Sequence, residues 1–491
     1  MEFSNLNWDS IREGFILLWV IGINYLLVFF ISLKILLENR NPQKTYAYVI
    51  LLIVVPFVGI LFYFSFGQNY RRNKIFNRKR ILDDKSFQEI STRLTKKSSE
   101  YRYDKDHSLR KISELLLTGS HSLLTGGNSL ELLINGENCF PKMLEAIAQA
   151  KNHIHMEYYI FTDDELGIQF IKALANKSEE GVEVRLIYDA AGSLKLSKKG
   201  ISILERAGVQ LLPFLPIRFP RLANSLNYRN HRKILVVDGV IGFVGGINVD
   251  QRYDNRFNNK VYWRDTHLKI SGNGVWNLQF TFLFDWYFCV KDPINFSDDF
   301  FPISESSTSI APLQVVSSGP DSDWSNIMYA YFTSINMAQS NIRLTTPYFI
   351  PNDSILMSLK TAALGGVNVE LLIPEESDST IVKYAMRSYF KQLLEAGVKI
   401  FLYRKGFVHA KTMTVDDSFC TIGTANMDFR SFELNFEVNA FIYDQNLTQM
   451  LVSQFEEDKK ESVQLMLSDV GRWKLPVRLG HSLARLFAPL L

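Results

Sequence analysis

Two apolar runs without a charged side chain lie near the N-terminus, at residues 15–33 (FILLWVIGINYLLVFFISL) and 47–66 (AYVILLIVVPFVGILFYFSF). Each run is about as long as a helix must be to cross the hydrocarbon core of a bilayer. Membrane helices tolerate Pro56 and Gly59 in the second run. No small-residue cleavage site follows the first run, which disfavours a signal peptide. The pattern predicts two transmembrane helices within residues 1–67.

Basic residues are distributed unevenly around these runs. Arg40 and Lys44 lie between them, whereas a larger group follows the second run: Arg71, Arg72, Lys74, Arg78, Lys79 and Arg80. Since basic flanks favour the cytoplasmic side, both termini and the downstream part of a multi-pass protein are expected in the cytoplasm. The same group could also contact anionic headgroups.

The segments at 68–125 and 470–491 differ from the rest of the chain. The first is polar and charged, with one helix expected around residues 107–117, and indicates a connector. The second places leucines at helical spacing with Arg478 and Arg485 beside them; these are Leu479, Leu483, Leu486 and Leu490. This is typical of an amphipathic helix lying on a bilayer. A terminal helix packed on the core is the alternative interpretation.

The long soluble part repeats itself. EEGVEVRLIYD at 179–189 matches GGVNVELLIPE at 365–375, and ERAGVQLLPF at 205–214 matches LEAGVKIFLY at 394–403. In each copy, helix-like stretches alternate with short strands rich in β-branched residues, which predicts α/β units. A stretch rich in Pro, Ser and acidic residues at 291–312 separates the copies. We therefore expect two α/β repeats, at residues 126–290 and 313–465.

Composition narrows the choice of protein class. The 491 residues are 47% hydrophobic, enough for more than one core, and the net charge of +3 is too small to indicate a nucleic-acid coat. Cys139, Cys289 and Cys420 are odd in number and outside any CxxC pattern. That argues against a disulfide framework or a zinc cluster, and favours a reduced, cytoplasmic catalytic part.

Two matched segments, at 230–250 and 408–428, carry the candidate chemistry. Both fit H-x-K-x4-D followed by G-x2-N, with identical spacing. The residues are His231, Lys233, Asp238, Gly245 and Asn248 in the first copy, and His409, Lys411, Asp416, Gly423 and Asn426 in the second. Two such motifs in register with a duplication are not a chance event.

On a strand, residues i and i+2 face the same way, so each histidine shares a face with its lysine. Asn248 and Asn426, on what is expected to be the next strand, could donate hydrogen bonds to an anion bound on that face. Asp238 and Asp416 stand at an odd offset from the histidines. They are expected to point elsewhere, which favours a structural role.

Bringing the two copies together about a pseudo-twofold axis would surround one pocket with two imidazoles, two ammonium groups and two amides. Such a pocket suits a phosphodiester, because cations would stand where negative charge develops. One neutral imidazole can attack phosphorus while the other, protonated, supplies the leaving alcohol with a proton. The route is a two-step transfer through a phosphohistidine.

The paired motifs resemble the HKD motifs of the phospholipase D superfamily. The resemblance implies a duplicated α/β sandwich with pseudo-twofold symmetry, and a catalytic set that includes Asp238 and Asp416. It also implies that the first-copy histidine, His231, is the nucleophile and that His409 is the acid and base.

In the same family a carboxylate often orients the imidazole. Glu437 matches that position in the second copy, whereas Asn259 stands at the corresponding place in the first. Asp265 is the candidate substitute, with a helix cap or a structural salt bridge as the alternatives. His267 beside it is interpreted as structural.

The resemblance extends to bacterial cardiolipin synthases over nearly the whole chain, including QVVSSGPDSDW at 314–324, TTPYFIPND at 345–353 and RLFAPLL at the end. It implies a phosphatidyltransferase in the cell membrane, with phosphatidylglycerol and cardiolipin as lipid partners and no nucleic acid. Two phosphatidylglycerols would give cardiolipin and glycerol. Neither apolar run contains Asp, as a metal-dependent CDP-alcohol transferase would require. No metal or other cofactor is therefore expected, and activity should resist chelators.

The sequence leaves three alternative functions to consider against this one. A phospholipase D, or a phosphatidyltransferase with a different alcohol acceptor, would use the same motifs. A nuclease is disfavoured by the apolar runs and by the lack of a basic, aromatic-laced stretch. A non-catalytic scaffold is disfavoured because all six motif residues are present.

Overall fold

The computed structural model describes residues 8–37, 42–63, 85–98, 107–216, 228–290, 297–303 and 311–488. Its internal contacts divide the chain into two units. One comprises Met1–Asn73 with Phe219–Asn227, and the other comprises Lys74–Arg218 with Tyr228–Leu491. Each unit is described by itself.

The smaller unit consists of helices α1 (Trp8–Leu37), α2 (Pro42–Val54) and α3 (Pro56–Phe62). Residues 47–63 were predicted as part of one helix, and this prediction was wrong, because the chain leaves the helical conformation at Val55 (φ −134°, ψ 72°). Pro56 explains the break. Its ring disfavours the α conformation of the preceding residue, and its missing N–H suits the first turn of a new helix. Residues 64–66 lie outside the described part.

Within the described part of the chain, no helix is both long enough and apolar enough to cross a membrane. The transmembrane character predicted for residues 15–33 and 47–66 is therefore not shown. The basic group at 71–80 lies outside the described residues.

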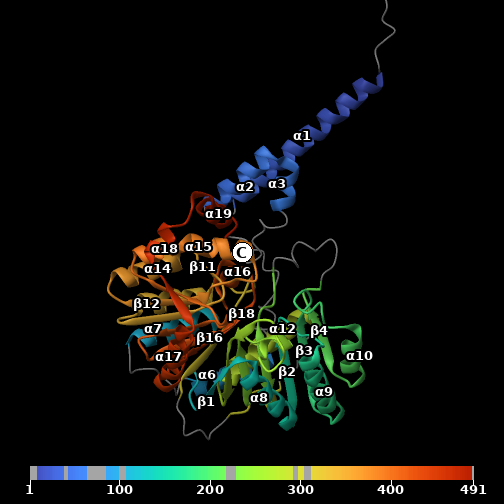
Figure 1. Cartoon of the computed structure of the whole chain (residues 1–491). Helices are drawn as coiled ribbons and strands as arrows, with labels where there is room; N and C mark the ends of the chain where they lie inside the picture. The colour runs from blue at the N-terminus through green and yellow to red at the C-terminus, as the bar shows by residue number, and fades with distance from the viewer. Residues whose placement is uncertain are drawn as a thin grey trace, which may run out of the picture. The chain divides into compact units, whose positions relative to one another are not determined.

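The larger unit contains a seven-stranded sheet built from the first repeat (Figure 1). Its strand order is β1-β8-β6-β5-β2-β3-β4. The strands are β1 (Ser129–Ile134), β2 (His153–Tyr158), β3 (Glu183–Asp189), β4 (Gln210–Phe214), β5 (Lys233–Val237), β6 (Ile241–Gly245) and β8 (Thr266–Ser271). The helices are α8 (Asn135–Gln149), α9 (Glu165–Glu179), α10 (Lys198–Arg206) and α12 (Val275–Val290).

The second repeat builds an eight-stranded sheet of order β19-β13-β12-β10-β15-β16-β18-β9. The strands are β9 (Leu313–Ser318), β10 (Asn341–Thr345), β12 (Asn368–Pro374), β13 (Lys399–Tyr403), β15 (Thr412–Val415), β16 (Phe419–Gly423), β18 (Glu437–Ile442) and β19 (Ser462–Leu465). The main helices are α13 (Asn326–Met337), α14 (Asp353–Leu364), α15 (Thr380–Glu395) and α17 (Gln445–Lys460). Without the added edge strand β19, the two sheets have the same order, which confirms the predicted duplication.

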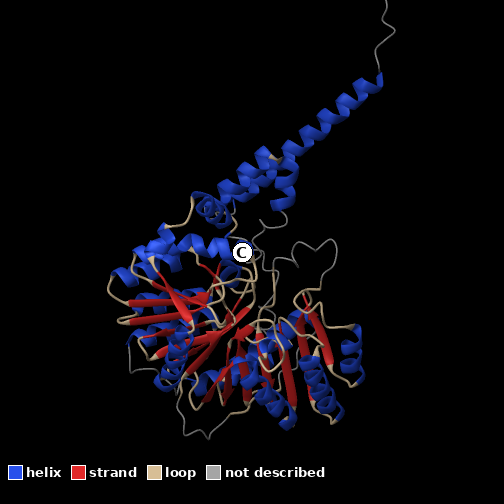
Figure 2. Cartoon of the chain, viewed as in Figure 1, coloured by secondary structure: helices blue, strands red, loops and turns tan. Residues whose placement is uncertain are grey.

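Local sequence explains this shared plan. In the first repeat β2, β3 and β4 are parallel neighbours, and α9 and α10 make the crossovers between them. Side chains of Asp164 and Ser197 cap the two helices by accepting from the backbone N–H groups of Gly167 and Gly200. The central strands β2 and β5 are buried along their whole length, because helices and the strands of the second sheet cover the faces of this sheet (Figure 2).

The two sheets pack on each other through one apolar core. Strands β5, β6 and β8 contribute Ile234, Val244 and Leu268 to a cluster that also contains Ile422 and Val438 of β16 and β18. A further link is the parallel pair of short strands β7 (Tyr262–Arg264) and β14 (Gly406–Val408), one from each repeat. The repeats therefore form a single body.

The predicted connector is more structured than expected. It contains α6 (Lys85–Ser98) as well as α7 (His107–Ser120), the helix expected around residues 107–117. Leu109, Ile112 and Leu116 of α7 are buried in the core of the second repeat. Their spacing fits one face of a helix, so α7 is part of that repeat's core.

The carboxylate of the motif aspartate fixes the same turn in both repeats. The carboxylate of Asp238, after β5, accepts hydrogen bonds from the backbone N–H groups of residues 151–153 at 2.8–3.0 Å. Asp416, after β15, accepts from those of residues 339–341 at 2.7–3.0 Å. Both aspartates adopt positive φ, 51° and 49°. They tie the loop after the motif strand to the start of its neighbour, β2 or β10.

We expect Asp238→Ala and Asp416→Ala each to lower the midpoint of thermal unfolding, at a cost of about 1–3 kcal/mol, because three backbone donors lose a charged acceptor. Asp→Asn at the same positions should cost less, since the amide oxygen still accepts and asparagine tolerates positive φ. Thermal unfolding followed by circular dichroism measures this. An unchanged midpoint in both alanine variants would contradict the structural role.

Candidate active site

Each of the two motif segments forms backbone hydrogen bonds with the opposite repeat. His231 and Lys233 stand at the start of β5, and His409 and Lys411 stand immediately before β15. The backbone N–H of His231 donates to the carbonyl of Phe436 at 2.9 Å, and that of His409 donates to the carbonyl of Arg264 at 2.7 Å. Each motif is thus held in place by backbone of the opposite repeat.

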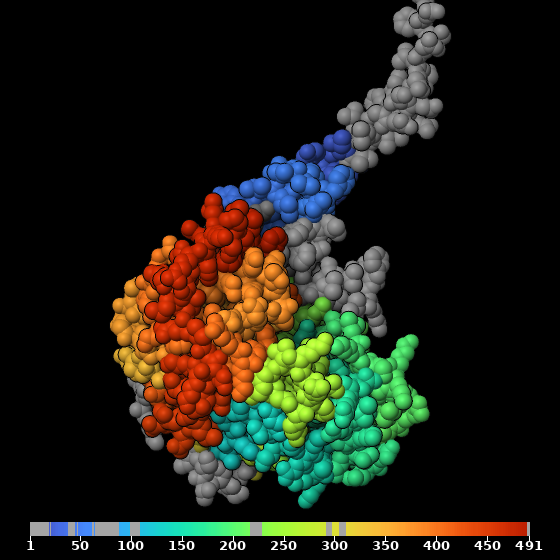
Figure 3. Space-filling view, viewed as in Figure 1, coloured from blue at the N-terminus to red at the C-terminus, as the bar shows by residue number. Residues whose placement is uncertain are grey.

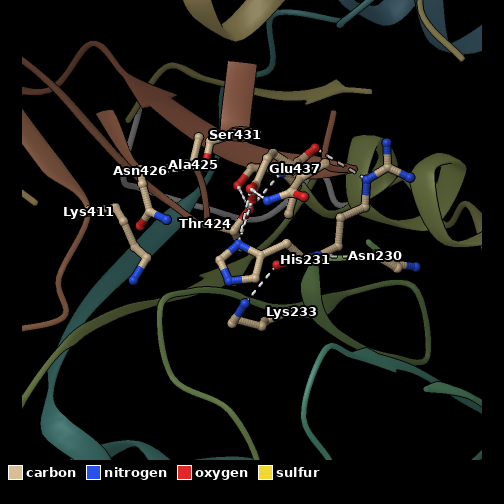
Figure 4. A network of polar contacts seen from close by, with 12 residues as sticks. Asn230, His231, Lys233, Lys411, Thr424, Ala425, Asn426, Ser431 and Glu437 are labelled. Atoms are coloured by element: carbon tan, nitrogen blue, oxygen red, sulfur yellow. Dashed lines mark hydrogen bonds and ion pairs between the residues drawn. The ribbon is translucent and has the colours of Figure 1, made fainter. Parts of the chain in front are cut away.

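His231 is oriented by a carboxylate of the second repeat (Figure 4). Its Nδ1 lies 2.9 and 3.0 Å from the two carboxylate oxygens of Glu437. Thr424 and Asn435 also donate to this carboxylate, at 2.5 and 3.2 Å. With Nδ1 committed, Nε2 is the nitrogen of His231 left for a substrate.

Burial lowers the pKa of His231 to about 4, against the opposing effect of Glu437. Burial by itself would raise the pKa of Glu437, but the contact with His231 and the nearby Lys233 bring it below its usual value. At neutral pH the pair is therefore a neutral imidazole beside an ionised carboxylate. That imidazole carries a lone pair on Nε2, as a nucleophile requires.

His409 is oriented in the same way by the first repeat. Its Nδ1 lies 2.7 Å from Oδ2 of Asp265, whose Oδ1 accepts from the backbone N–H of Thr266 at 2.7 Å. Burial raises the pKa of Asp265 to about 6, against the effect of Lys411. Burial, and then the charge of Lys411, hold the pKa of His409 well below its usual range.

Strand register explains why Asp265, and not Asn259, faces the imidazole. Gly245 pairs with His267 across β6 and β8, and Gly423 pairs with Asn439 across β16 and β18. Counting two residues back from each partner, Asp265 is the equivalent of Glu437. The first repeat has extra residues in this loop, where Asn259 uses its amide to donate to the carbonyls of residues 251, 252 and 254.

Both motif lysines are buried within the site. Lys233 Nζ donates to the carbonyl of His231 at 2.7 Å, and Lys411 Nζ lies 2.9 Å from each ring nitrogen of His409. Burial lowers the pKa of Lys233 to about 7 and that of Lys411 to about 8, against the attraction of Glu437 and Asp265. The site therefore combines two imidazoles with two desolvated cations.

The two motif asparagines, predicted as equivalent anion donors, have different surroundings. Oδ1 of Asn248 accepts from the N–H of Ile160 at 3.1 Å, and its Nδ2 donates to the hydroxyl of Tyr253 at 2.6 Å. Asn426 lies beside Lys411 in Figure 4, and its Oδ1 is buried without a hydrogen-bond partner. Asn248 braces the loop, whereas the amide of Asn426 remains available for a ligand.

Asp238 and Asp416 do not join this group, since their carboxylates hold the turns described above. The motif also failed to indicate three participants: Thr424 and Asn435, which brace Glu437, and Tyr159, whose ring centroid lies 5.0 Å from that of His231. Thr424 follows the motif glycine directly, so its position was the one available signal. Among the described residues, no group of three or more His, Cys, Asp or Glu is arranged to hold a metal ion.

This geometry brings two imidazoles and two ammonium groups into one buried site, in which Nε2 of His409 lies 2.9 Å from Lys411 Nζ. Each imidazole has a carboxylate behind it that fixes its ring and stabilises its positive charge when a proton arrives. That is the arrangement needed for nucleophilic attack by one histidine and proton transfer by the other.

Comparison with known proteins agrees with this chemistry. The family described as "Cardiolipin synthase, PLD-like domain" matches residues 143–270 and 331–459, and the family described as "Phospholipase_D-nuclease N-terminal" matches residues 26–68. The chain is 43% identical to cardiolipin synthase 2 of Bacillus anthracis over 467 residues, which is 94% of this chain and 90% of the relative. It is 42% identical to a cardiolipin synthase of Geobacillus sp. (strain WCH70), covering 94% and 92%.

The fold has a solved counterpart. The crystal structure of phosphatidylserine synthase from Haemophilus influenzae Rd KW20 matches 79% of this chain and all of that protein, with a TM-score of 0.61 at 15% identity. At that identity the likeness concerns the fold alone. The full-length relatives and the two matched domains carry the assignment: the chain belongs to the cardiolipin synthase family with phospholipase D-like domains.

Proposed function

We propose that the protein is a cardiolipin synthase, a phosphatidyltransferase that moves a phosphatidyl group from one phosphatidylglycerol to another and releases glycerol. The observation that carries the proposal is the pair of crossed contacts, His231 with Glu437 and His409 with Asp265. The relatives with that name, similar over 94% of this chain, supply the substrate class.

In the first step, Nε2 of His231 attacks the phosphorus of the donor lipid. The bond from phosphorus to the glycerol oxygen breaks, and His409 delivers a proton from Nε2 to that oxygen. The charge of the bound phosphodiester opposes the effect of Lys233 and Lys411 on His409 and therefore raises the pKa of this imidazole when substrate binds. The two ammonium groups stabilise the charge that develops on the phosphoryl oxygens.

In the second step, a glycerol hydroxyl of the acceptor lipid attacks the phosphohistidine. His409 takes the proton of that hydroxyl, the nitrogen–phosphorus bond breaks, and His231 regains its lone pair. We assign the attack to His231 and the proton transfers to His409 from the family resemblance, since the neutral form predominates in both histidines and each has a carboxylate at Nδ1. Asp238 and Asp416 serve the reaction only by holding the motif strands.

A phospholipase D, or a transferase with another alcohol acceptor, would use the same histidines. The reaction products therefore distinguish these activities. We expect the purified protein to convert phosphatidylglycerol vesicles into cardiolipin and glycerol, identified by mass spectrometry. His231→Ala and His409→Ala should each reduce the rate by a factor of about a thousand or more, because neither step has a substitute for the missing imidazole. Phosphatidic acid as the sole product would instead indicate a hydrolase.

The pKa values of Lys233 and Lys411 predict that the activity depends on pH. An ammonium group is charged below its pKa and loses its charge as the pH rises through it, here at about 7 for Lys233 and about 8 for Lys411. We therefore expect kcat/KM to fall between pH 7 and pH 9, about tenfold per pH unit once a lysine has titrated. kcat should change less, since a bound phosphate keeps the lysines protonated.

Initial rates in mixed micelles across this pH range measure the effect. In Lys233→Arg the alkaline fall should move to higher pH, because a guanidinium stays charged. A flat kcat/KM profile to pH 10 in the unchanged protein would contradict the assignment of these lysines as phosphate-binding cations.

We also propose that the protein works at the cell membrane, anchored by its N-terminal helices with both termini in the cytoplasm. What supports this is the absence of charge in residues 15–33 and 47–66, and the basic residues that follow them. Apolar side chains of α1 and α3 are exposed, including Phe29, Phe30 and Phe57.

A second contact with the bilayer would come from α19 (Leu475–Arg485), within the predicted interfacial segment at 470–491. His481 and Ala484 are its buried residues, and the ring of His481 packs on Tyr384 of α15. Leu475, Leu479 and Leu483 remain 75%, 57% and 52% exposed. Figure 3 shows this C-terminal part, in red, at the surface. Leu490 lies outside the described residues.

Replacing Leu479 and Leu483 together by Asp should lower the rate on phosphatidylglycerol vesicles roughly tenfold, since two leucines no longer enter the bilayer. The rate on a dispersed short-chain phosphatidylglycerol should not change. Leu364→Asp is the matched control, because this leucine is 70% exposed at the end of α14. Equal loss on both substrate forms would contradict a bilayer contact.

A further inference from the structure

A buried ion pair stands behind each of the two carboxylates that orient the histidines. Arg232 is paired with Asp285 of α12, and Arg264 is paired with Asp458 of α17. All four residues are buried, with between 1% and 5% of their surface exposed. Replacing a buried ion pair by apolar side chains is often neutral or stabilising. Stability alone therefore does not account for these two pairs.

Arg264 holds the backbone that carries Asp265. Its Nε and Nη2 lie 2.9 and 2.8 Å from the two carboxylate oxygens of Asp458, a paired geometry that fixes the plane of the guanidinium. The remaining nitrogen, Nη1, donates to the carbonyl of Asp265 at 2.5 Å and to the hydroxyl of Thr266 at 2.9 Å. Thr266 in turn donates its N–H to the carboxylate of Asp265. Arg264 thus fixes the short segment that presents this carboxylate to His409.

Arg232 holds the backbone of Glu437 in a similar way. Its Nε donates to the carbonyl of Glu437 at 3.2 Å, and its Nη1 donates to the carboxylate of Asp285. Its guanidinium carbon also lies 5.3 Å from the centre of the Phe436 ring, a cation–π contact. The carbonyl of Phe436 accepts from the N–H of His231. Arg232 therefore contacts both the residue that supports the backbone of His231 and the residue that orients its ring.

The two arginines come from different positions of the repeat. Arg232 directly follows the motif histidine, where the second repeat has Ala410. Arg264 directly precedes the orienting carboxylate, where the second repeat has Phe436. At these two pairs of positions each half of the site has one arginine, but the arginine is supplied from a different strand.

The aspartates that anchor the arginines follow the duplication. Asp285 and Asp458 lie on α12 and α17, the helices that follow β8 and β18 in their repeats. In both halves the aspartate belongs to the same repeat as the histidine, and the orienting carboxylate belongs to the other. Inheritance of one ancestral arginine does not produce this pattern, because the arginines are not equivalent. A common requirement at both histidines does.

The surroundings of Arg232 decide how its ion pair can be removed. Burial by itself would lower the pKa of Arg232, but the charges of Asp285 and Asp321 raise it above its usual value. Burial, and then the charge of Asp285, raise the pKa of the neighbouring Glu157 well above its usual range, so Glu157 is neutral. Removing the guanidinium and the charge at position 285 together therefore leaves this buried carboxyl group uncharged.

We propose that Arg232 and Arg264 are positioning residues of the reaction. Each holds the backbone of the carboxylate that orients one imidazole, Glu437 beside His231 and Asp265 beside His409. A displacement of about 1 Å at a catalytic group can lower a rate about a hundredfold, so this support matters although neither arginine reaches the substrate. The kinetic test rests on the proposed function, whereas the contacts themselves do not.

The leaving group separates the two arginines. With phosphatidylglycerol, His409 must protonate the departing glycerol oxygen, whereas p-nitrophenolate leaves a short-chain phosphatidyl-p-nitrophenol as a stable anion. In that reaction Nε2 of His231 forms its bond to phosphorus, and the bond from phosphorus to the p-nitrophenolate oxygen breaks without proton transfer. The initial burst of p-nitrophenolate therefore depends on His231 and needs no acid, while cardiolipin formation depends on both histidines.

Each ion pair is best replaced as a whole, which avoids an uncompensated buried charge. In Arg264→Met with Asp458→Leu, cardiolipin formation should fall about tenfold to a hundredfold, while the p-nitrophenolate burst stays within about threefold. In Arg232→Met with Asp285→Asn, both rates should fall about tenfold to a hundredfold. Lysine at position 232 or 264, with the aspartate kept, should restore part of the loss because one donor remains.

Arg343→Met is the matched control. Arg343 also lies in an ion-pair network, with 13% of its side chain exposed, and its Nη1 lies 2.6 Å from Asp417, outside the site. This variant should leave the ratio of the two rates unchanged. Thermal unfolding followed by circular dichroism shows whether each variant is folded.

The ring-nitrogen resonances of isotopically labelled histidine give a readout that needs no substrate. Assigned with His231→Ala and His409→Ala, the Nδ1 resonance of His409 should move in the variant at 264 and 458, and that of His231 in the variant at 232 and 285. Unmoved resonances, or an equal fall of both rates in both folded variants, would overturn the proposal. The mirror-image kinetic pattern would support it with the roles of the histidines exchanged. If the unaltered protein catalyses neither reaction, the proposed function fails and the resonances still decide the positioning role.

Discussion

The active site depends on one exchange between the repeats: each imidazole is held by a carboxylate that belongs to the opposite half of the chain. Glu437 of the second repeat orients His231, and Asp265 of the first orients His409. The backbone bonds from His231 to Phe436 and from His409 to Arg264 also cross between the repeats. Because each histidine and its carboxylate come from different repeats, the site exists only while the two sheets are packed together.

Packing of the sheets is therefore the energetic basis of the site. The shared apolar core between β5, β6, β8 and β16, β18 holds the two repeats together. It also removes water from the four ionisable groups of the motifs, and this desolvation is the first cause of the low pKa of both histidines and both lysines. Fold stability and the reactivity of the imidazoles have a common origin.

The sequence predicted much of this arrangement, because most of the site residues lie close together within the two duplicated segments. The repeated H-x-K-x4-D spacing placed the histidines and lysines correctly beside each other, and the odd offset of Asp238 and Asp416 indicated their position away from the pocket. Glu437 was found because it follows the motif at a fixed distance. Its equivalent in the first repeat, Asp265, was harder to predict. The loop before β8 is longer than its counterpart in the second repeat, so Asp265 does not stand at the same distance from His231 as Glu437 does from His409.

Other features could not be predicted from the spacing of residues along the sequence, because they depend on contacts made only in the folded protein. The two motif asparagines look equivalent along the chain, yet only Asn248 meets the hydroxyl of Tyr253. The helix α7 seemed part of a connector because its packing partner, β9, begins far along the chain at Leu313. Pro56 is compatible with a single membrane helix on sequence grounds, but because it has no N–H to donate it starts a new helix in the structure.

The crossed carboxylates also limit how the two repeats can change over evolutionary time. A duplicated gene segment is ordinarily free to diverge, since one copy can keep the original task. Here Glu437 and Asp265 are each the partner of a histidine encoded in the other copy, so a loss in either half disables a residue of the opposite half. The halves are obliged to change together, and neither can become a working unit by itself.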